Sequence, residues 1–341
     1  TSGTTPSNGG GLALVTFGDA ELIDCVFTVN RADRNGGAIW GFAETLLLAG
    51  CEFDRNQAGQ HGGAIQIASE SMTIDGCVFV DNTAVAGGGA VFSSGSGRQE
   101  LFVKGSRFTR NESPFGGAML VRQQLPRIEQ SVFMGNASTM DGGAIRFLFC
   151  AQVVLDSNSF ESNASAESGG AISFDVVRAR DGVDLLGNTF TGNIARIGGA
   201  VYTTEASGDD TIFSFAERDG LVNTFGGNTA VLGDDIYHAG PADIDATGVC
   251  WGTTVPIAIA ARIYDGVDEP GLGIVRFDPV ATDCDVCPAD LDGDGVLTVF
   301  DYLTFSGLFG LGDLQADFDG DGSLTLFDFL AFQVAFDAGC P

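Results

Sequence analysis

The sequence predicts an all-β fold, a right-handed parallel β-helix, followed by a small α-helical module at the C-terminus. Three features of the 341 residues carry this prediction: a unit of about 26 residues that recurs up to residue 240, short apolar runs inside each unit, and a duplicated aspartate-rich loop near the C-terminus. Recurring units of this length are typical of solenoids, in which each unit packs only against its neighbours. We therefore expect a rod of stacked coils with a separate terminal module.

Two landmarks mark each unit: a phenylalanine with an asparagine three residues after it, and a pair of glycines. The phenylalanines are Phe27, Phe53, Phe79, Phe108, Phe133, Phe160, Phe190 and Phe225. The asparagines are Asn30, Asn56, Asn82, Asn111, Asn136, Asn163, Asn193 and Asn228. The glycine pairs begin at Gly10, Gly36, Gly62, Gly88, Gly116, Gly142, Gly169 and Gly198. Because successive pairs start 26 to 29 residues apart, residues 1–240 are predicted to form about eight coils.

The segments between the landmarks predict strands. The apolar runs at residues 65–67 and 72–74, for example, are short and alternating, whereas an amphipathic helix would place apolar residues three or four apart. A unit of about 26 residues has room for three such strands. That is one turn of a parallel β-helix, whose coils stack about 4.8 Å apart.

In such a stack each side chain lies over its counterpart in the next coil, so the recurring residues are interpreted as ladders. The phenylalanines would form an aromatic ladder inside the coils. The asparagines would hydrogen-bond the turn backbone and tolerate a left-handed conformation, and the glycines would supply positive φ and leave room for the next coil. Two positions before each phenylalanine a further ladder is predicted at Cys25, Cys51, Cys77, Ser106, Ser131, Asn158, Asn188 and Asn223.

The glycine step reads Gly-Gly-Ala-Ile in four coils, at residues 36–39, 62–65, 142–145 and 169–172. Together with the Phe-x-x-Asn step, this pattern resembles the repeat of the polymorphic outer membrane protein family, known by its GGAI and FxxN tetrapeptides. The resemblance covers residues 7–240. It implies a secreted or surface-displayed β-helix of bacterial type, often with an adhesive role.

Residues 241–283 are predicted to form a C-terminal cap and linker. After Asn228 the double glycine is replaced by Gly233-Asp234, and terminal repeats of a solenoid are expected to be atypical. Residues 284–341 then form the terminal module.

The terminal module contains two loops with the spacing of a calcium site. Oxygen ligands at positions 1, 3, 5, 7, 9 and 12, with glycine at position 6, surround one Ca²⁺ in such a loop. In the first loop these ligands would be Asp290, Asp292, Asp294, the carbonyl of Val296, Thr298 and Asp301. In the second they would be Asp317, Asp319, Asp321, the carbonyl of Ser323, Thr325 and Asp328. The sequence therefore predicts two calcium ions.

Each loop is followed by a short apolar helix, expected at residues 300–309 and 327–336. Two EF-hand-like loops with one helix each resemble the type I dockerin module. The resemblance implies recognition of a cohesin through residues late in each loop, commonly polar pairs. This chain has Val299-Phe300 and Leu326-Phe327 there, which indicates either a buried helix pair or a different partner. A calcium-stapled terminal cap is the alternative interpretation.

Charge limits the classes of partner. The chain has a formal net charge of −29, and residues 283–341 contain 12 aspartates with no Lys, Arg or Glu. Without cations these like charges would repel each other, so metal binding is expected to drive folding of the module. The remaining negative charge argues against nucleic acid or an anionic membrane as partner. No apolar run is long enough to span a bilayer, so we expect no membrane insertion.

Cysteine usage points to an oxidising compartment. Cys287 and Cys340 bracket the calcium module, and Cys250 and Cys284 bracket the cap, so both pairs are disulfide candidates, although sequence alone leaves the connectivity open. The four other cysteines are interpreted as buried thiols that act as small apolar residues. With Thr1-Ser2-Gly3 at its start, the chain is expected to be a mature secreted protein, extracellular or on a cell surface.

No enzymatic activity is expected. The chain has only two histidines, His61 and His238, and its nearest candidate carboxylates are Asp234-Asp235, in a terminal coil, and Asp209-Asp210, in an enlarged loop. We expect a secreted calcium-binding structural or adhesive protein, whose end coil and calcium module could join copies head to tail. Its partners would be further copies, a surface or matrix protein, or a glycan. The alternative is a β-helix protein that binds or cleaves polysaccharide.

Overall fold

The computed structural model describes residues 7–177, 182–205, 213–218, 220–281, 297–311 and 324–338, and the single residues 284, 289, 291, 316 and 318. The chain divides into two compact units, Thr1–Ala281 and Thr282–Pro341.

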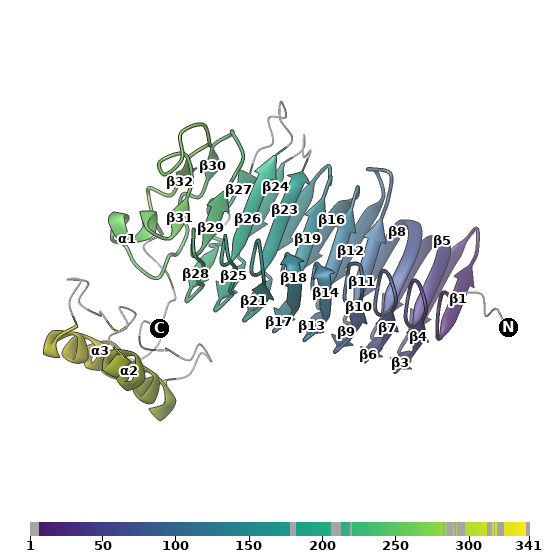
Figure 1. The fold of residues 1–341 in the computed structure, drawn as a ribbon, viewed down its shortest axis with the longest axis horizontal. Coiled ribbons are helices and arrows are strands. Elements are labelled where there is room, and N and C mark those ends of the chain that lie inside the picture. The colour runs from purple at the N-terminus through teal and green to yellow at the C-terminus, as the bar shows by residue number, and fades with distance from the viewer. Residues whose placement is uncertain are drawn as a thin grey trace. The chain divides into compact units, whose positions relative to one another are not determined.

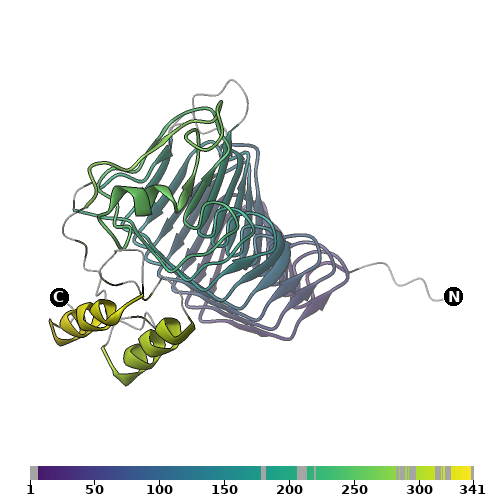
Figure 2. The same ribbon diagram turned by 60° about the vertical axis from the view of Figure 1, so that its left-hand side comes forward.

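The first unit is a right-handed parallel β-helix of about nine turns (Figure 1). Its strands form three parallel sheets, one with 18 strands, one with eight and one with six. Seen closer to the rod axis, the coils superpose along the stack (Figure 2). The predicted all-β solenoid is thus confirmed.

The 18-stranded sheet contains two rows of strands. The row that follows the glycine pairs is β1 (Leu12–Val15), β5 (Ile39–Ala49), β8 (Ile65–Asp75), β11 (Val91–Ser94), β15 (Met119–Arg122), β19 (Ile145–Leu148), β23 (Ile172–Val177), β26 (Val201–Glu205), β29 (Ile236–His238) and β31 (Ile263–Tyr264). The second row, which shares β5 and β8, adds β2 (Asp19–Ile23), β12 (Glu100–Lys104), β16 (Leu125–Glu129), β20 (Val153–Asp156), β24 (Val183–Leu186), β27 (Phe213–Ser214), β30 (Ile244–Asp245) and β32 (Val275–Arg276).

The two smaller sheets contain the phenylalanines and the turn that follows the asparagines. The eight-stranded sheet is β3 (Val26–Thr28), β6 (Glu52–Asp54), β9 (Val78–Val80), β13 (Arg107–Thr109), β17 (Val132–Met134), β21 (Ser159–Glu161), β25 (Thr189–Thr191) and β28 (Thr224–Gly226). The six-stranded sheet is β4 (Arg31–Ala32), β7 (Gln57–Ala58), β10 (Thr83–Ala84), β14 (Glu112–Phe115), β18 (Ala137–Asp141) and β22 (Ala164–Ser165).

The phenylalanines form the predicted ladder. Their ring centroids are 4.7 to 5.1 Å apart with interplanar angles of at most 10°. From Phe53 onward every ring is fully buried. Burial of one such side chain contributes roughly 1.5–3 kcal/mol, and the ring pairing adds about 0.5–1.5 kcal/mol.

The solenoid continues past the last phenylalanine. Trp251 stacks on Phe225 with centroids 5.1 Å apart, and β29 pairs with β31 and β30 with β32 in parallel register. Residues 241–276 therefore include strands of a further coil as well as the helix α1 (Pro256–Ala260). The sequence predicted about eight coils because the landmark phenylalanine and its asparagine are replaced in this one.

The paired glycines have the two roles predicted for them. From Gly36 onward the first residue of each predicted pair has positive φ, 61° at Gly36 for example, a conformation that glycine adopts without steric cost. In the first coil Gly9 has this conformation, with φ 67°, so the pair begins one residue before the predicted Gly10. The second residue lies against the next coil, and a Cβ built on Gly37 would overlap the carbonyl oxygen of Gly63. The double glycine is thus a requirement of coil stacking.

The asparagine ladder connects successive coils. The backbone N–H and the side-chain Nδ2 of Asn82 both donate to Oδ1 of Asn111, at 3.0 and 2.9 Å, and Nδ2 also donates to the carbonyl of Phe53 at 2.9 Å. The left-handed conformation lies elsewhere than predicted: the residue before the asparagine adopts it, as at Asp81 with φ 54°. That turn directs the asparagine side chain inward, where it satisfies buried backbone groups.

The third ladder works in the same way, and it corrects the interpretation of its cysteines. The backbone N–H of Cys51 donates to Sγ of Cys77 at 3.4 Å, and that of Cys77 donates to Oγ of Ser106 at 3.1 Å. Cys25, Cys51, Cys77 and Cys150 are free thiols, as predicted. Cys51 and Cys77 are hydrogen-bond acceptors as well as small buried groups, which explains why serine and asparagine can occupy this position in other coils. Cys25, at the first rung, is only half-buried.

The second unit contains α2 (Val299–Leu311) and α3 (Leu326–Ala338). Both extend one or two residues beyond each end of the predicted helices. Phe305 and Phe332 are buried and stack with centroids 4.3 Å apart, and Tyr302 packs edge-on against Phe332 at 5.3 Å. Among the described residues, no helix is both long and apolar enough to cross a membrane.

Candidate functional site

Each helix of the second unit begins at a capping box. Oγ1 of Thr298 accepts the N–H of Phe300 at 3.1 Å, while the carboxylate of Asp301 accepts the N–H of Thr298 at 2.7 Å. The same pair of bonds recurs at α3, where Thr325 and Asp328 take these places at 3.1 and 2.6 Å. This reciprocal arrangement satisfies two N–H groups that a helix start leaves without partners. Sequence reasoning assigned these residues to calcium and missed their capping role, which the Thr-x-x-Asp spacing signals.

Asp301 and Asp328 are fully buried carboxylates. The second oxygen of Asp301 accepts the N–H of Leu291 at 2.8 Å. A buried carboxylate is costly unless hydrogen bonds or a cation compensate its charge. Hard oxygen donors at the last position of both loops therefore fit the predicted Ca²⁺.

The other predicted calcium ligands lie outside the described residues. These are Asp290, Asp292, Asp294, Val296, Asp317, Asp319, Asp321 and Ser323. Within the part of the chain that is described, no three His, Cys, Asp or Glu side chains gather as a metal site would require. The two calcium ions thus remain a prediction.

Apolar side chains face solvent at matching positions of α2 and α3. Val299, Phe300 and Leu303 are 61 to 64 % exposed. Their counterparts one repeat later, Leu326, Phe327 and Leu330, are exposed as well. Of the two alternatives for these positions, the buried helix pair does not hold, because the helices pack through other residues. Exposed apolar patches of this kind mark interaction surfaces.

One of the two disulfide candidates is observed. Cys250 and Cys284 are disulfide-bonded, which confirms that pairing. Cys287 and Cys340 lie outside the described residues.

The candidate catalytic carboxylates are placed in structural roles. Asp235 is fully buried, forms an ion pair with Nε of Arg262 at 2.8 Å and accepts Nδ2 of Asn228 at 3.0 Å. Burial raises the pKa of Asp235 to about 6, although Arg262 and Asn228 oppose the shift. Asp234 accepts the N–H of Ala230 at 2.7 Å and closes a turn. Asp209-Asp210 lie outside the described residues.

The two histidines are not brought together with those carboxylates. His238 is buried, with Nδ1 2.7 Å from Oγ1 of Thr203 and Nε2 2.6 Å from the carbonyl of Ala242, and burial lowers its pKa. His61 stacks on Phe92 with centroids 4.4 Å apart, and burial lowers its pKa too. His61 precedes β8 and His238 ends β29, several coils apart.

A charged cluster that sequence reasoning missed lies on the outer face of the large sheet. Arg146 on β19 pairs with Asp141 at 3.5 Å and with Asp175, and its guanidinium lies over the ring of Phe115, 4.4 Å from the centroid. Burial raises the pKa of Asp141, while Arg146 opposes the shift. No sequence spacing signals this cluster, because its members come from three different coils.

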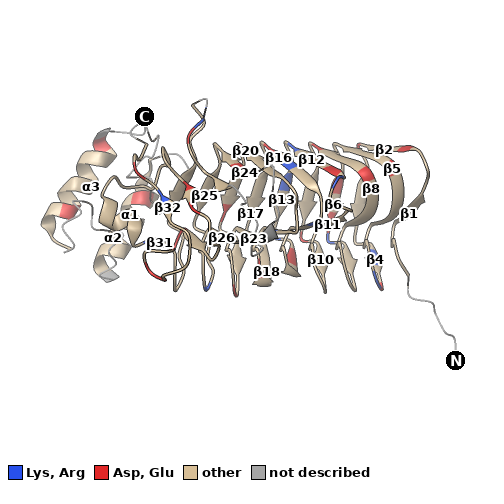
Figure 3. Ribbon diagram, turned by 90° about the horizontal axis from the view of Figure 1, so that it is seen from above, with Lys and Arg blue, Asp and Glu red and all other residues tan. Residues whose placement is uncertain are grey.

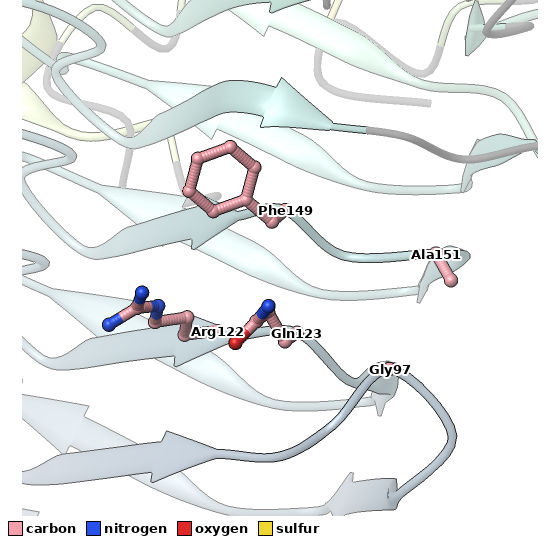
Figure 4. Close-up of a pocket in the computed structure, with 5 residues that line it drawn as sticks. All are labelled: Gly97, Arg122, Gln123, Phe149 and Ala151. Carbon is pink, nitrogen blue, oxygen red and sulfur yellow. The ribbon is translucent and has the colours of Figure 1, made fainter.

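Beside this cluster the lateral wall is hollowed. The hollow has a volume of about 350 Å³ and is lined by Gly97, Arg122, Gln123, Phe149 and Ala151. Figure 4 shows the side chains of Arg122 and Phe149 extending to the same side from neighbouring coils, with Gln123 beside them. Blue segments of the ribbon, which mark Lys and Arg, occur near β12, β13 and β16 (Figure 3). The hollow thus combines a cation, an amide and an aromatic ring.

The first coil presents an unpaired edge. Strands β1, β2 and β3 pair with the second coil, and no described strand pairs with their other side. Val15, Phe17, Ile23, Val26 and Val29 are exposed there. An apolar edge with free backbone groups is a template for further strands.

Comparison with known proteins agrees with this geometry. Residues 2–133 match a family described as the right handed beta helix region. The chain carries right-handed β-helix repeats. The match spans the first five glycine pairs, and the remaining coils continue the same ladders. No curated protein and no solved structure matches the chain.

Proposed function

We propose that this protein is a secreted, calcium-binding structural or adhesive extracellular protein whose copies join head to tail. The observation that carries the proposal is the first coil, where no described strand pairs with the outer side of β1, β2 and β3 and where several apolar side chains are exposed. Because an exposed apolar edge is a template for further strands, we expect a partner to cover it. A coil of a second copy matches its strand spacing and its ladders.

The C-terminal module would supply the calcium dependence. Its two capping boxes position buried carboxylates where each loop needs its last ligand, and the exposed apolar residues on α2 and α3 offer a docking surface. That surface would contact either a neighbouring copy or a cohesin-like surface or matrix protein. The disulfide between Cys250 and Cys284 supports an extracellular location, because disulfides persist in oxidising compartments.

Sedimentation of the purified chain in millimolar calcium and in excess chelator tests this proposal, with far-UV circular dichroism on both samples. We expect large species in calcium that dissolve in chelator while the β signal persists. A protein that stays monomeric in both conditions would contradict assembly and leave calcium with a folding role alone. A variant with Val26→Lys, which charges the open edge, should remain monomeric in calcium.

A glycan partner is the second candidate. The specific observation that favours it is the lateral hollow with Arg122, Gln123 and Phe149, since saccharides are recognised by flat aromatic rings together with planar hydrogen-bonding groups. Cleavage is less supported, because the described carboxylates and histidines do not converge on this hollow.

A further inference from the structure

We propose that the hollow beside β15 and β19 is a binding subsite for a sugar ring that bears a carboxylate. This deepens the adhesive role proposed above and specifies its ligand. The hollow lies on the lateral wall, so the inference is separate from end-to-end assembly.

The hollow is built by backbone hydrogen bonds and is therefore present before any ligand binds. One wall is the segment between β11 and β12, where Gly95 donates to the carbonyl of Arg122 at 3.0 Å and Gly97 to that of Gln123 at 2.6 Å. The floor is fixed between coils, because the N–H of Gln123 donates to the carbonyl of Leu148 at 3.0 Å. Pre-formed sites of this kind avoid the entropic cost of ordering on binding.

The charge of Arg122 points to an anionic ligand. Arg122 is exposed and makes no ion pair with any residue in the described part of the chain, whereas the nearby carboxylate of Asp175 is engaged by Arg146. A guanidinium binds a carboxylate through two parallel hydrogen bonds. The net charge of −29 does not prevent this locally, because charges are screened beyond about 8 Å at physiological salt.

The conformation of Phe149 points to a flat, partly apolar ligand. Its φ is 57°, and among the described non-glycine residues with positive φ only Val29 and Phe149 are apolar. A bulky residue held in this region is strained, and such strain concentrates at binding sites. Gln123 is held in the same way, with φ 53°. The strained backbone directs an aromatic face and an amide to the same hollow.

The geometry favours a saccharide over a peptide. An extended peptide binds by adding a strand to an unpaired sheet edge, but β15 and β19 are paired on both sides. A hollow of about 350 Å³ instead accepts one or two rings. In this placement Phe149 covers an apolar ring face, Arg122 binds the carboxylate and Gln123 bonds a hydroxyl.

Isothermal titration of the full chain with trigalacturonate and with neutral cellotriose, at fixed calcium and ionic strength, tests the inference. We expect trigalacturonate to bind more tightly than cellotriose. Arg122→Gln should weaken its binding roughly tenfold or more, as expected for loss of a hydrogen bond to a charged group. Arg122→Lys should give an intermediate loss. Phe149→Asn should also weaken binding while leaving the thermal midpoint unchanged or higher, because asparagine tolerates positive φ.

Arg34→Gln is the matched control, since Arg34 is exposed at the end of the first coil and should not affect binding. Equal affinity for both trisaccharides, unchanged binding by Arg122→Gln, or no binding of either sugar would each overturn the inference. Assembly in calcium without sugar binding would overturn the subsite alone. Loss of both assembly and sugar binding would overturn the proposed function as well.

Discussion

The solenoid and the C-terminal module satisfy their buried polar groups by different means. In the solenoid the two neighbouring coils supply the partners of the asparagine ladder: Nδ2 of Asn82 donates to Asn111 in the next coil and to the carbonyl of Phe53 in the previous one, and its Oδ1 accepts an N–H group from the previous coil. In the module, the buried carboxylates of Asp301 and Asp328 accept backbone N–H groups, and they also occupy the last position of each predicted calcium loop. The difference teaches that stacking alone stabilises one unit, whereas the other is expected to need a cation.

Removal of calcium should reveal the largest difference in stability between the two units. In excess chelator we expect α2 and α3 to unfold while the solenoid keeps its β signal, because metal binding is folding energy for a small acidic module. Circular dichroism at 222 nm, with limited proteolysis to locate the cut, measures this. The double variant Asp301→Asn with Asp328→Asn should lose the same helical signal even in the presence of calcium. A module that stays helical in chelator would show that its aromatic core suffices.

Gly63→Ala should strongly destabilise the solenoid. The new Cβ would overlap the carbonyl oxygen of Gly89 in the next coil, and relief requires the coils to separate. We expect a loss of about 3 kcal/mol or more in the free energy of unfolding, at the upper end of overpacking costs. Gly76→Ala is the control, because nothing lies within 4 Å of its Cβ position; its φ of 60° is positive, whereas that of Gly63 is not, so any cost at Gly76 comes from the backbone alone. Its cost should be only about 1–2 kcal/mol. Equal losses in urea titrations would refute the stacking explanation.

Asn111→Ala should remove a rung of the asparagine ladder. Asn82 would lose the acceptor for its backbone N–H and its Nδ2, and the carbonyl of Phe79 would lose its donor. Buried groups left without partners cost about 1–3 kcal/mol, so we expect a loss of about 3 kcal/mol. Asn30→Ala, at the half-buried first rung, should cost about 1 kcal/mol or less. A similar loss for both variants would show that the rungs do not depend on their two neighbours.

Asp235 should give the solenoid a pH-dependent stability. Its pKa is raised to about 6 from an ordinary value of 3.8, so the folded state holds this proton more tightly than the unfolded state does. The contribution of Asp235 to the free energy of unfolding is then largest below about pH 4. It falls as the pH rises to about 6, by on the order of 2–3 kcal/mol. Denaturant titrations across this range should show the fall, and Asp235→Asn should flatten it. A profile that is unchanged by Asp235→Asn would assign the dependence to other groups.

Cys77→Ser should have the smallest effect. The hydroxyl can take over the thiol's place, since Ser106 already accepts the N–H of Cys77 one coil later. We expect a change below about 1 kcal/mol. A much larger loss in thermal denaturation would show that the size of sulfur in the packed core matters more than hydrogen bonding.

The recurring residues of the sequence predicted the structural features that arise from stacking one coil on the next. The aromatic ladder, the glycine steps and the coil height follow from residues that recur at fixed spacing. The ninth coil was not predicted, because Trp251 replaces its phenylalanine. The left-handed turn residue was assigned one position too late, since its side chains vary and only its backbone is shared.

The lateral sites could not be predicted because they depend on residues that do not recur. Arg122 and Phe149 come from adjacent coils, and Arg146 contacts Phe115 of the previous coil and Asp175 of the next one. Spacing along the chain does not show which outward side chains will become neighbours. The predicted calcium loops are the opposite case, because the expected ligands of each loop lie in one contiguous segment.

The side-chain amide dipoles of the asparagine ladder are aligned along the axis of the rod. From Asn56 onward each side-chain oxygen accepts from the previous coil. Each Nδ2 donates to the asparagine of the next coil as well as, from Asn56 onward, to a phenylalanine carbonyl of the previous one; the series runs from Asn30 to Asn228, whose Nδ2 donates to the buried carboxylate of Asp235. The aligned amide dipoles thus end on an anion, as a helix N-terminus would. At the first coil the series begins with an amide oxygen. Two rods meeting through their first coils would bring like poles together, so this interior favours filaments in which all rods point the same way.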